Sequence, residues 1–402
     1  MLDLRFAKKE DKALMKKMWQ DIFSDSKEFV DWFFEERFYP PNSVLAFKDN
    51  NLVSALHSLD IHVNVRGVNL KSTFISGVAT YPEYRRQGFM NKIFSYYLEE
   101  IQKKSVFISY LKADYIPTYY ALGYYPVTDS AYVSMERIKR EIEIEANNLK
   151  KENKKKKDYT VYSKKIKDLS LEEIKELRKV YDNFAKNFSN IILRDTFEFQ
   201  RKLRDYGADQ AKCMIQKEND MMQAYCIYYE EEDVYVEEFI SSNPKDTKIL
   251  IEALEGLDKS LKIKMSKKIA QETKLDNIEI LPQNSMNIIN VEKFLESVLR
   301  HDNNGLGKEE ENNKAYSAYT LKVKDSFLPQ NTGIYNLLGE RLDDSAPYHF
   351  EIDSYYLGQL ISGYRSLEQL RELNLIDIKD HVACKEINLL LPALDTFMVE
   401  EY

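Results

Sequence analysis

The sequence VATYPEYRRQGFM, residues Val78–Met90, decides the fold of this 402-residue chain. The apolar, β-branched run Lys71–Thr80 leads into it and predicts a strand, and Pro82 interrupts the chain directly afterwards. The residues that follow, Gly88–Lys103, carry apolar side chains at helical spacing on one face and predict an amphipathic helix. A strand, a short turn and a helix therefore follow one another here.

The turn between this strand and this helix has the chemistry of a phosphate site. The first amides of a helix have no acceptor within the helix, and the helix dipole is positive there, so a pyrophosphate can bind them. Gly88 permits close approach of the backbone, and Arg85 and Arg86 add positive charge. Arginine and glycine also occur in ordinary surface turns, but the strand before and the helix after make this pattern specific.

The elements around the turn alternate between helix and strand, which indicates a mixed α/β arrangement of the α+β class. We expect strands at Leu52–Leu59 and Ile61–Val68, joined tightly, and a short buried strand at Ser105–Leu111. Asp114 can cap the next helix, and Gly123 fits the position after its end.

The middle of the chain repeats this order of elements. The charged run Lys150–Asp158 is expected to be a solvated linker rather than a nucleic-acid contact. Beyond it we expect a helix at Ile249–Leu261, after an antiparallel meander of the strands Ala211–Gln216, Met222–Tyr229 and Val234–Ser241. Asn243–Asp246 stands where Arg85–Gly88 stood before, so this second unit is predicted to keep a similar scaffold without a phosphate site.

The last third of the chain, residues 291–402, has a different pattern. It begins with a polar stretch, His301–Lys314, that we expect to be a long loop, and it ends in an apolar segment, Ala393–Tyr402. Between them we expect strands at Tyr316–Val323 and Tyr348–Ile352 and helices at Tyr355–Gly363 and Leu367–Leu373.

The composition is that of a globular protein and excludes several classes of function. The net charge of −8 argues against nucleic acid and suits a cationic substrate, although it also serves solubility. The three cysteines, Cys213, Cys226 and Cys384, and the five histidines are scattered, so we expect no metal site and no disulfide framework. The start of the chain lacks the layout of a signal peptide and no apolar run is long enough to span a membrane, so we expect a cytoplasmic location and no membrane partner.

The segment GVATYPEYRRQGFMNKIF, residues 77–94, resembles the acetyl-CoA-binding motif of the Gcn5-related N-acetyltransferases (GNAT). It looks most like the enhanced intracellular survival (Eis) subgroup, and TYYALGYY at Thr118–Tyr125 is similar to that subgroup's tyrosine helix. Looser resemblances cover Met214–Ile240, Ser285–Ser297 and Tyr355–Ile376. The resemblance implies tandem GNAT-like domains with central mixed sheets at 1–150 and 151–290, the second degenerate, and a sterol-carrier-protein-like α+β domain at 291–402.

The resemblance implies a cofactor site for acetyl-CoA and no metal. The strand would pair with the pantetheine arm and aim an amide at the thioester carbonyl, and the turn would hold the pyrophosphate. The implied cofactor-binding residues are Val78, Ala79, Thr80, Arg85, Arg86, Gln87, Gly88, Phe89, Met90 and Asn91. Met90 departs from the Gly or Ala that is usual in the family: its side chain either faces the core or crowds the phosphate site.

The resemblance also implies the catalytic groups. Tyr119 matches the family's general acid, which protonates the departing thiolate, although one residue of offset would select Tyr120, and Tyr115 is a neighbour. The terminal carboxylate of Tyr402 matches the family's general base. Since its ordinary pKa of about 3.5 makes it a weak base, it acts through a water, through a raised pKa, or by attracting the cation.

The residues expected to bind the acceptor amine lie in the early helices and at the chain end. Asp25 could pair with an ammonium group, and Trp32 could stack on one. Glu36 and Glu401 complete the expected substrate-binding set. Each of these residues is equally compatible with an ordinary surface or core role.

We therefore expect an N-acetyltransferase that transfers acetyl to a primary amine, such as an aminoglycoside, a polyamine or a lysine-like substrate, by direct attack in a ternary complex. The alternatives are a CoA- or lipid-binding protein with little turnover, and an acyltransferase for longer chains. The resemblance implies a homo-oligomer, with a hexamer as the state common in the family.

Overall fold

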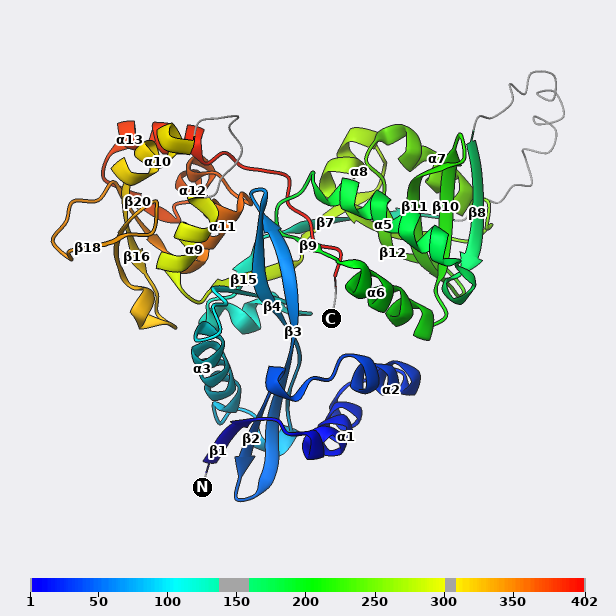
Figure 1. Cartoon of the computed structure of the whole chain (residues 1–402), viewed down its shortest axis with the longest axis horizontal. Helices are drawn as coiled ribbons and strands as arrows, with labels where there is room; N and C mark the ends of the chain where they lie inside the picture. The colour runs from blue at the N-terminus through cyan, green and yellow to red at the C-terminus, as the bar shows by residue number, and fades with distance from the viewer. Residues whose placement is uncertain (1, 137–158, 301–308, 401–402) are drawn as a thin grey trace. The chain divides into compact units, whose positions relative to one another are not determined.

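The computed structural model describes residues 2–136, 159–300 and 309–400, so the expected linker Lys150–Asp158 lies outside the described residues (Figure 1). The chain divides into two compact units. The first contains Met1–Thr128, Lys186–Leu193 and Pro282–Tyr402, and the second contains Asp129–Ala185 and Arg194–Leu281.

The first unit is built on a mixed sheet in the order β1-β2-β3-β4-β5-β15-β6, with β9 added along β3. Its strands are β1 (Leu2–Phe6), β2 (Ser43–Lys48), β3 (Asn51–Val65), β4 (Val68–Thr80), β5 (Ile108–Lys112), β6 (Tyr125–Pro126), β9 (Ile191–Leu193) and β15 (Asn284–Ile288). The β4–β5 pair is parallel, because α3 (Phe89–Gln102) connects the two strands as a crossover. The mixed α/β fold class expected from the sequence is confirmed.

Helices cover both faces of this sheet (Figure 1). On one face α3 packs through Ile93, Phe94, Tyr97 and Leu98, which are almost fully buried, and this confirms the helix expected at Gly88–Lys103. On the other face α1 (Lys12–Ile22) and α2 (Lys27–Glu36) bring a cluster of aromatic side chains against β2–β4. The turn between β4 and α3 therefore lies at the margin of a two-sided core.

The C-terminal part adds a five-stranded sheet to the first unit, in the order β18-β17-β16-β19-β20. Its strands are β16 (Thr320–Lys324), β17 (Gly333–Asn336), β18 (Arg341–Leu342), β19 (Phe350–Asp353) and β20 (Ile376–Ile378); its helices are α9 (Val291–Leu299), α10 (Glu309–Ala318), α11 (Ser354–Ser362), α12 (Leu367–Glu372) and α13 (His381–Leu390). One continuous apolar core includes Tyr110 of β5, Met286 of β15 and Leu357 of α11. That shared core is why these parts form one unit.

The second unit repeats the order of elements around a seven-stranded sheet, β14-β7-β13-β12-β11-β10-β8. Its strands are β7 (Asp129–Met135), β8 (Tyr159–Lys165), β10 (Lys212–Glu218), β11 (Met221–Glu230), β12 (Val234–Ile240), β13 (Leu261–Ser266) and β14 (Ile278–Pro282); its helices are α5 (Leu171–Ala185), α6 (Thr196–Ala208), α7 (Pro244–Glu255) and α8 (Lys267–Thr273). The expected meander is confirmed as β10-β11-β12. The helix expected at Ile249–Leu261 begins earlier, because Asn243 caps it and Pro244 occupies its first turn, and it ends earlier, at Glu255, since Leu261 begins β13.

The domain boundaries expected at residues 150 and 290 do not follow the compact units. Strand β7 precedes the first boundary but pairs with β13 of the second unit. Strand β15 precedes the second boundary but completes the sheet of the first unit, where it pairs with β5 and β6. Each of these two strands hydrogen-bonds to strands that lie far away from it in the sequence, so the sequence pattern around it does not show which sheet it joins.

The strand expected at Tyr316–Val323 begins only at Thr320, because Tyr316–Ala318 belong to α10. Three further local expectations were wrong. The strands Leu52–Leu59 and Ile61–Val68 are one strand, β3, because Asp60 keeps its side chain in solvent while its backbone pairs with Thr73, and the turn lies at residues 66–67. Asp114 caps no helix: Tyr115 precedes the 3-10 helix η4 (Ile116–Leu122), although Gly123 does take the left-handed conformation after it. The expected loop His301–Lys314 is helical from Glu309 onward.

Candidate functional site

A bulge near the end of β4 shapes the candidate site. Ala79 pairs with Ala55 of β3 and Ser76 pairs with His57, so three steps along β4 match two along β3. Gly77 lies in the bulge with φ +54°, and a Cβ there would come within 2.2 Å of the Trp19 ring. Glycine is therefore required here for both conformation and space.

Strands β4 and β5 separate just before this bulge. They pair only over Thr73–Ile75 and Ser109–Leu111, and β4 then continues to Thr80 while β5 ends at Lys112. The predicted cofactor residues Val78, Ala79 and Thr80 lie on the part of β4 that pairs with β3 but has passed the end of its pairing with β5. Their backbone on the β5 side has no strand partner among the described residues, so it can pair with an extended ligand.

The N-terminus of α3 follows directly and is uncapped. Gly88 precedes α3 with φ +76°, no side chain caps the helix, and within the described chain no residue accepts from the amides of Phe89, Met90 and Asn91. A Cβ on Gly88 would meet nothing within 4 Å. Three amides without an acceptor thus lie at the positive end of a helix, and the space beside Gly88 is open.

Positive side chains surround these amides. Arg85 and Arg86 are exposed, and Arg85 Nε donates to the Thr80 carbonyl at 3.1 Å, which fixes it beside the end of β4. Gln87 is also exposed and accepts a 3.2 Å hydrogen bond from Lys48 Nζ. Lys48 comes from β2 and no sequence pattern singled it out, because only the fold brings β2 beside α3.

Met90 faces the core rather than the free amides. Its side chain is half-buried against the apolar cluster under α3. Of the two interpretations left open by the sequence, the structure therefore favours the one in which this residue leaves the helix N-terminus accessible.

Tyr119 lies in η4 on the same face of the sheet as α3. Its ring is half-buried, 6.0 Å from that of Phe94 between centroids. Burial raises the pKa of the Tyr119 hydroxyl, and the carboxylate of Asp114 raises it further. Tyr119 therefore carries its proton at neutral pH, as a general acid must.

The neighbouring tyrosines differ from Tyr119. Tyr115 is 69% exposed, and Tyr120 stacks on Tyr125 of β6 at 4.3 Å. Tyr125 in turn stacks on Tyr355 of α11 at 3.9 Å. Tyr120 thus belongs to an aromatic stack at the sheet edge, whereas Tyr119 turns toward α3.

The C-terminal segment is anchored to the first unit up to Glu400. Ser189 donates from its amide to the Asp395 carbonyl at 2.8 Å, and Phe397 donates back to the Ser189 carbonyl at 3.2 Å. At the end of β15, Asn284 Nδ2 donates to the Glu400 carbonyl at 3.1 Å. Asn284 pairs with Lys112, the last residue of β5, so the segment reaches the end of β5 where β4 and β5 have separated.

The chain end itself, Glu401 and Tyr402, lies outside the described residues. The residues just before it are almost fully buried: Phe397, Met398, Val399 and Glu400 are each exposed by 2% or less. The apolar C-terminal segment is therefore packed against the first unit as far as Glu400.

The three substrate residues predicted in the early helices do not form one cluster. Asp25 accepts a 2.7 Å hydrogen bond from the Trp19 indole, so its carboxylate orients the ring that covers Gly77. Trp32 has the Arg37 guanidinium 5.6 Å from its ring centroid, which occupies one face of the ring. Glu36 is exposed at the end of α2.

The equivalent helix of the second unit, α7, is capped. Asn243 accepts from the amide of Asp246 at 2.9 Å and caps α7. The buried Asp246 carboxylate accepts from Gln216 and Asn243, each at 2.6 Å. A fixed negative charge at this position repels phosphate, as expected from the NPKD sequence.

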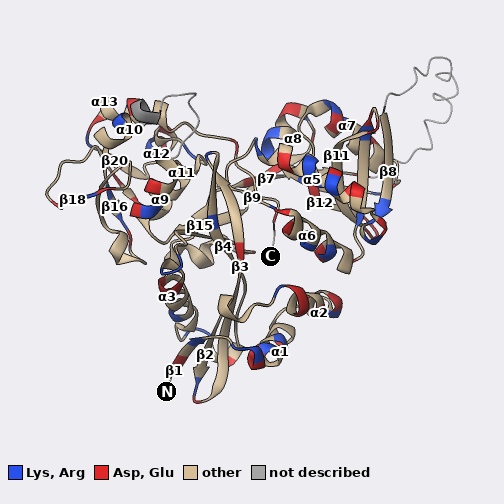
Figure 2. Ribbon diagram, in the orientation of Figure 1, with Lys and Arg blue, Asp and Glu red and all other residues tan. Residues whose placement is uncertain are grey.

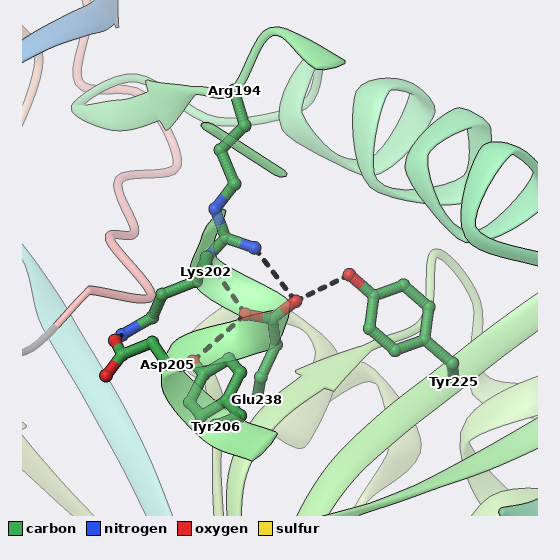
Figure 3. Close-up of polar contacts among 6 residues, drawn as sticks. All are labelled: Arg194, Lys202, Asp205, Tyr206, Tyr225 and Glu238. Carbon is green, nitrogen blue, oxygen red and sulfur yellow. Dashed lines mark hydrogen bonds and ion pairs between the residues drawn. The ribbon is translucent and has the colours of Figure 1, made fainter. Parts of the chain in front are cut away.

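Side chains of the second unit fill the region after the β12–β13 pair, where β12 likewise continues beyond its parallel partner. Figure 3 shows Glu238 of β12 held in a bidentate ion pair by Arg194 at 2.9 and 3.1 Å, with Tyr225 and Tyr206 also donating to it. Burial opposes ionisation of Glu238, but Arg194 holds its pKa below the usual range. Both oxygens of the Glu238 carboxylate accept hydrogen bonds from side chains of the protein. We therefore place the candidate site in the first unit.

The charged side chains on the helices are mixed in sign, and the possible metal ligands do not cluster among the described residues. Lysine and arginine are interspersed with aspartate and glutamate along the helices of each unit (Figure 2). Among the described residues, histidine, cysteine and carboxylate side chains form no group of three that could hold a metal. Within the same residues, every helix is too short or too polar to cross a bilayer.

Two family models match the chain. Residues 3–127 match an acetyltransferase (GNAT) domain, and residues 291–399 match a sterol carrier protein domain. No curated protein sequence matches.

Solved structures share the fold over the full length of both chains. A probable N-acyltransferase of Enterococcus faecalis V583 is 20% identical with a TM-score of 0.76. A GCN5-related N-acetyltransferase of Anabaena variabilis is 15% identical with a TM-score of 0.76, and Eis1 of Mycobacterium abscessus is 14% identical with a TM-score of 0.72. The resemblance found in the sequence therefore extends to the fold along the whole length of the chain.

Proposed function

We propose that this GNAT-family chain, with its acetyltransferase domain at residues 3–127 and its sterol carrier protein domain at 291–399, transfers an acetyl group from acetyl-CoA to a primary amine. The observation that carries the proposal is the succession of three features in one sheet: the end of β4 that is open on its β5 side, the free α3 amides, and a protonated tyrosine. This is the arrangement that a thioester with a pyrophosphate requires.

The donor would be held mainly by backbone groups. The amides of Phe89–Asn91 and the cations Arg85, Arg86 and Lys48 suit the pyrophosphate. The unpaired backbone of Val78–Thr80 suits the amide groups of a pantetheine arm, and an amide freed by the Gly77 bulge suits the thioester carbonyl. Acetyl-CoA then supplies the acyl group.

The transfer itself is a direct displacement. The ammonium group first loses one proton to solvent. The neutral amine nitrogen then bonds to the acetyl carbon while the carbon–sulfur bond breaks, Tyr119 donates its proton to the departing sulfur, and the nitrogen loses its second proton. A carboxylate at the chain end is suited to attract the ammonium group and to receive that proton through water. The burial of residues 397–400 beside β15 supports a role for Glu401 and Tyr402 there.

The acceptor is proposed to be cationic: an aminoglycoside, a polyamine or a lysine-like amine. The carboxylates of Asp25 and Glu36, both exposed, would attract it. Stacking on Trp32 is compatible only with the ring face away from Arg37. Assembly into a homo-oligomer such as a hexamer, a cytoplasmic location and the absence of nucleic-acid and membrane partners stay predictions.

Turnover distinguishes this function from its rivals. The protein is incubated with acetyl-CoA and a panel of polyamines, aminoglycosides and lysine derivatives, and free thiol is measured against a no-amine control. We expect amine-dependent thiol release with an equimolar acetylated product. Binding of acetyl-CoA with no release above background for any amine favours a CoA- or lipid-binding protein, and faster release from longer acyl-CoA favours a long-chain acyltransferase.

A further inference from the structure

A strip of polar side chains runs beneath η4, on the face of the sheet that carries α3. In the antiparallel pair of β15 and β5, Ser285 lies opposite Leu111 and Asn287 opposite Ser109. Directly opposed residues point to the same face of a sheet. Leu111 belongs to the core under α3, so Ser285 and Asn287 point there as well.

This strip is tied to the segment that carries Tyr119. Asn287 Nδ2 donates to the carbonyl of Leu122, the last residue of η4, at 2.6 Å. Tyr124 donates from its hydroxyl to Ser109 Oγ at 2.9 Å. Residues three apart on a 3-10 helix lie on the same side, so Tyr119 and the fully buried Leu122 both face the strip.

Two atoms of the strip have no hydrogen-bond partner among the described residues. They are Ser285 Oγ and Asn287 Oδ1, on side chains that are 0% and 2% exposed. A buried polar group without a partner costs about 1–3 kcal/mol, and native proteins satisfy such groups with ordered water or a ligand. Ser285 is the nearer of the two to the end of β5, where β4 and β5 have separated.

We propose that Ser285 is a positioning residue for the reaction: its hydroxyl, through one buried water, donates a hydrogen bond to the Tyr119 oxygen. A donor on that oxygen stabilises the negative charge that develops as Tyr119 gives its proton to sulfur. The water keeps both of its protons during the transfer, and Tyr119 recovers its own from solvent after the thiol leaves. The inference rests on the proposed function for its chemistry, but its geometry can be tested without turnover.

The kinetic test uses Ser285→Ala in the full-length chain, alone and combined with Tyr119→Phe. One hydrogen bond corresponds to a fall in kcat of about three- to tenfold, with KM for acetyl-CoA unchanged. In the Tyr119→Phe background Ser285→Ala should have no further effect, because the group that it serves is gone. An equal effect in both backgrounds, or a change in KM alone, overturns the proposal.

Ser130→Ala is the matched control. Ser130 in β7 is also 0% exposed and its hydroxyl is also unpartnered among the described residues, but it belongs to the sheet of the second unit. It should leave kcat unchanged. If both alanine variants slow the enzyme equally, loss of a buried hydroxyl acts through stability and the assignment of Ser285 is wrong.

A second readout needs no turnover. With 3-fluorotyrosine placed at position 119, the fluorine resonance reports ionisation of that ring as pH is raised. Removing a donor from its oxygen should move the titration upward by about half to one pH unit in Ser285→Ala. An unchanged titration overturns the proposal even if the protein is an active enzyme, and a shifted titration supports it even if no amine is acetylated.

Discussion

At the scale of single residues, Tyr119 is the side chain on which the proposed chemistry depends most. Its protonated state follows from burial and from Asp114. General acid catalysis typically contributes about 10²–10⁴-fold, so Tyr119→Phe should lower kcat by about that factor while acetyl-CoA still binds. Steady-state thiol release measures the change.

Tyr115→Phe is the control for this prediction. Tyr115 precedes the same η4 segment and is 69% exposed, so losing its hydroxyl should leave kcat within about twofold. If Tyr115→Phe is the slow variant and Tyr119→Phe is not, the acid has been assigned to the wrong ring.

His57 predicts how the first unit responds to acid. It is buried among aromatic rings, and burial lowers its pKa to about 3. The unfolded chain takes up this proton near pH 6.5 and the folded chain does not, so stability is lost as pH falls through the interval from 6.5 toward 3. At pH 5.5 this one group should cost about 1.4 kcal/mol relative to pH 7.5.

The measurement compares thermal unfolding of His57→Gln with that of the original chain at both pH values. The variant should lose less stability on acidification. His62→Gln is the control, since His62 lies on the same strand but is exposed. Equal acid sensitivity of His57→Gln and the original chain would mean that His57 is charged in the fold.

At the scale of elements, the uncapped α3 accounts for cofactor binding. Replacing both Arg85 and Arg86 by glutamate puts negative charge beside the free amides. Charge-assisted hydrogen bonds contribute about 1.5–3 kcal/mol, so the Kd for acetyl-CoA should rise at least about tenfold, and less at high salt. Titration calorimetry gives both Kd and stoichiometry, which should be one site per chain.

The equivalent helix of the second unit supplies the control. Lys245→Glu changes an exposed cation at the start of α7, where Asn243 already caps the helix and the Asp246 carboxylate lies beside it. It should leave Kd unchanged. A stoichiometry of two, or sensitivity to Lys245, would place a binding site in the second unit and contradict the account.

The elements that the sequence predicts well are those whose signal is local. The α3 helix follows from its apolar spacing, and the left-handed Gly123 follows from its place after η4. Gly77 carried an unused signal, since an isolated glycine in a strand indicates a bulge, but its contact with Trp19 is a product of the fold. Lys48 and Ser285 gave no signal, because their proximity to the site depends on the pairing of distant strands.

At the scale of the whole molecule, the order of strands explains why the compact units differ from the domains predicted from the sequence. The sequence has three successive patterns, whereas β7 and β15 are each exchanged into the other sheet. A strand pattern shows that a segment pairs but not with which partner. The presence of sheets could therefore be predicted from the sequence. Which strands make up each sheet could be seen only in the structure.

The anchored C-terminal segment is a prediction at this scale. Ending the chain at Glu400 removes Glu401 and Tyr402 but leaves the contacts of Ser189 and Asn284 with the segment. The fold and the Kd for acetyl-CoA should be retained, while kcat/KM for the amine should fall by about tenfold or more. Unchanged turnover would show that the chain end has no part in the reaction.

The proposed acetyl-CoA site depends on the free amides of α3 and on the end of β4 that is open on its β5 side, and a crystal structure with bound CoA tests both most directly. We predict the pyrophosphate within hydrogen-bonding distance of the amides of Phe89–Asn91 and the pantetheine arm alongside Val78–Thr80. Side chains closing the space between β4 and β5, or CoA bound elsewhere on the chain, would contradict the account.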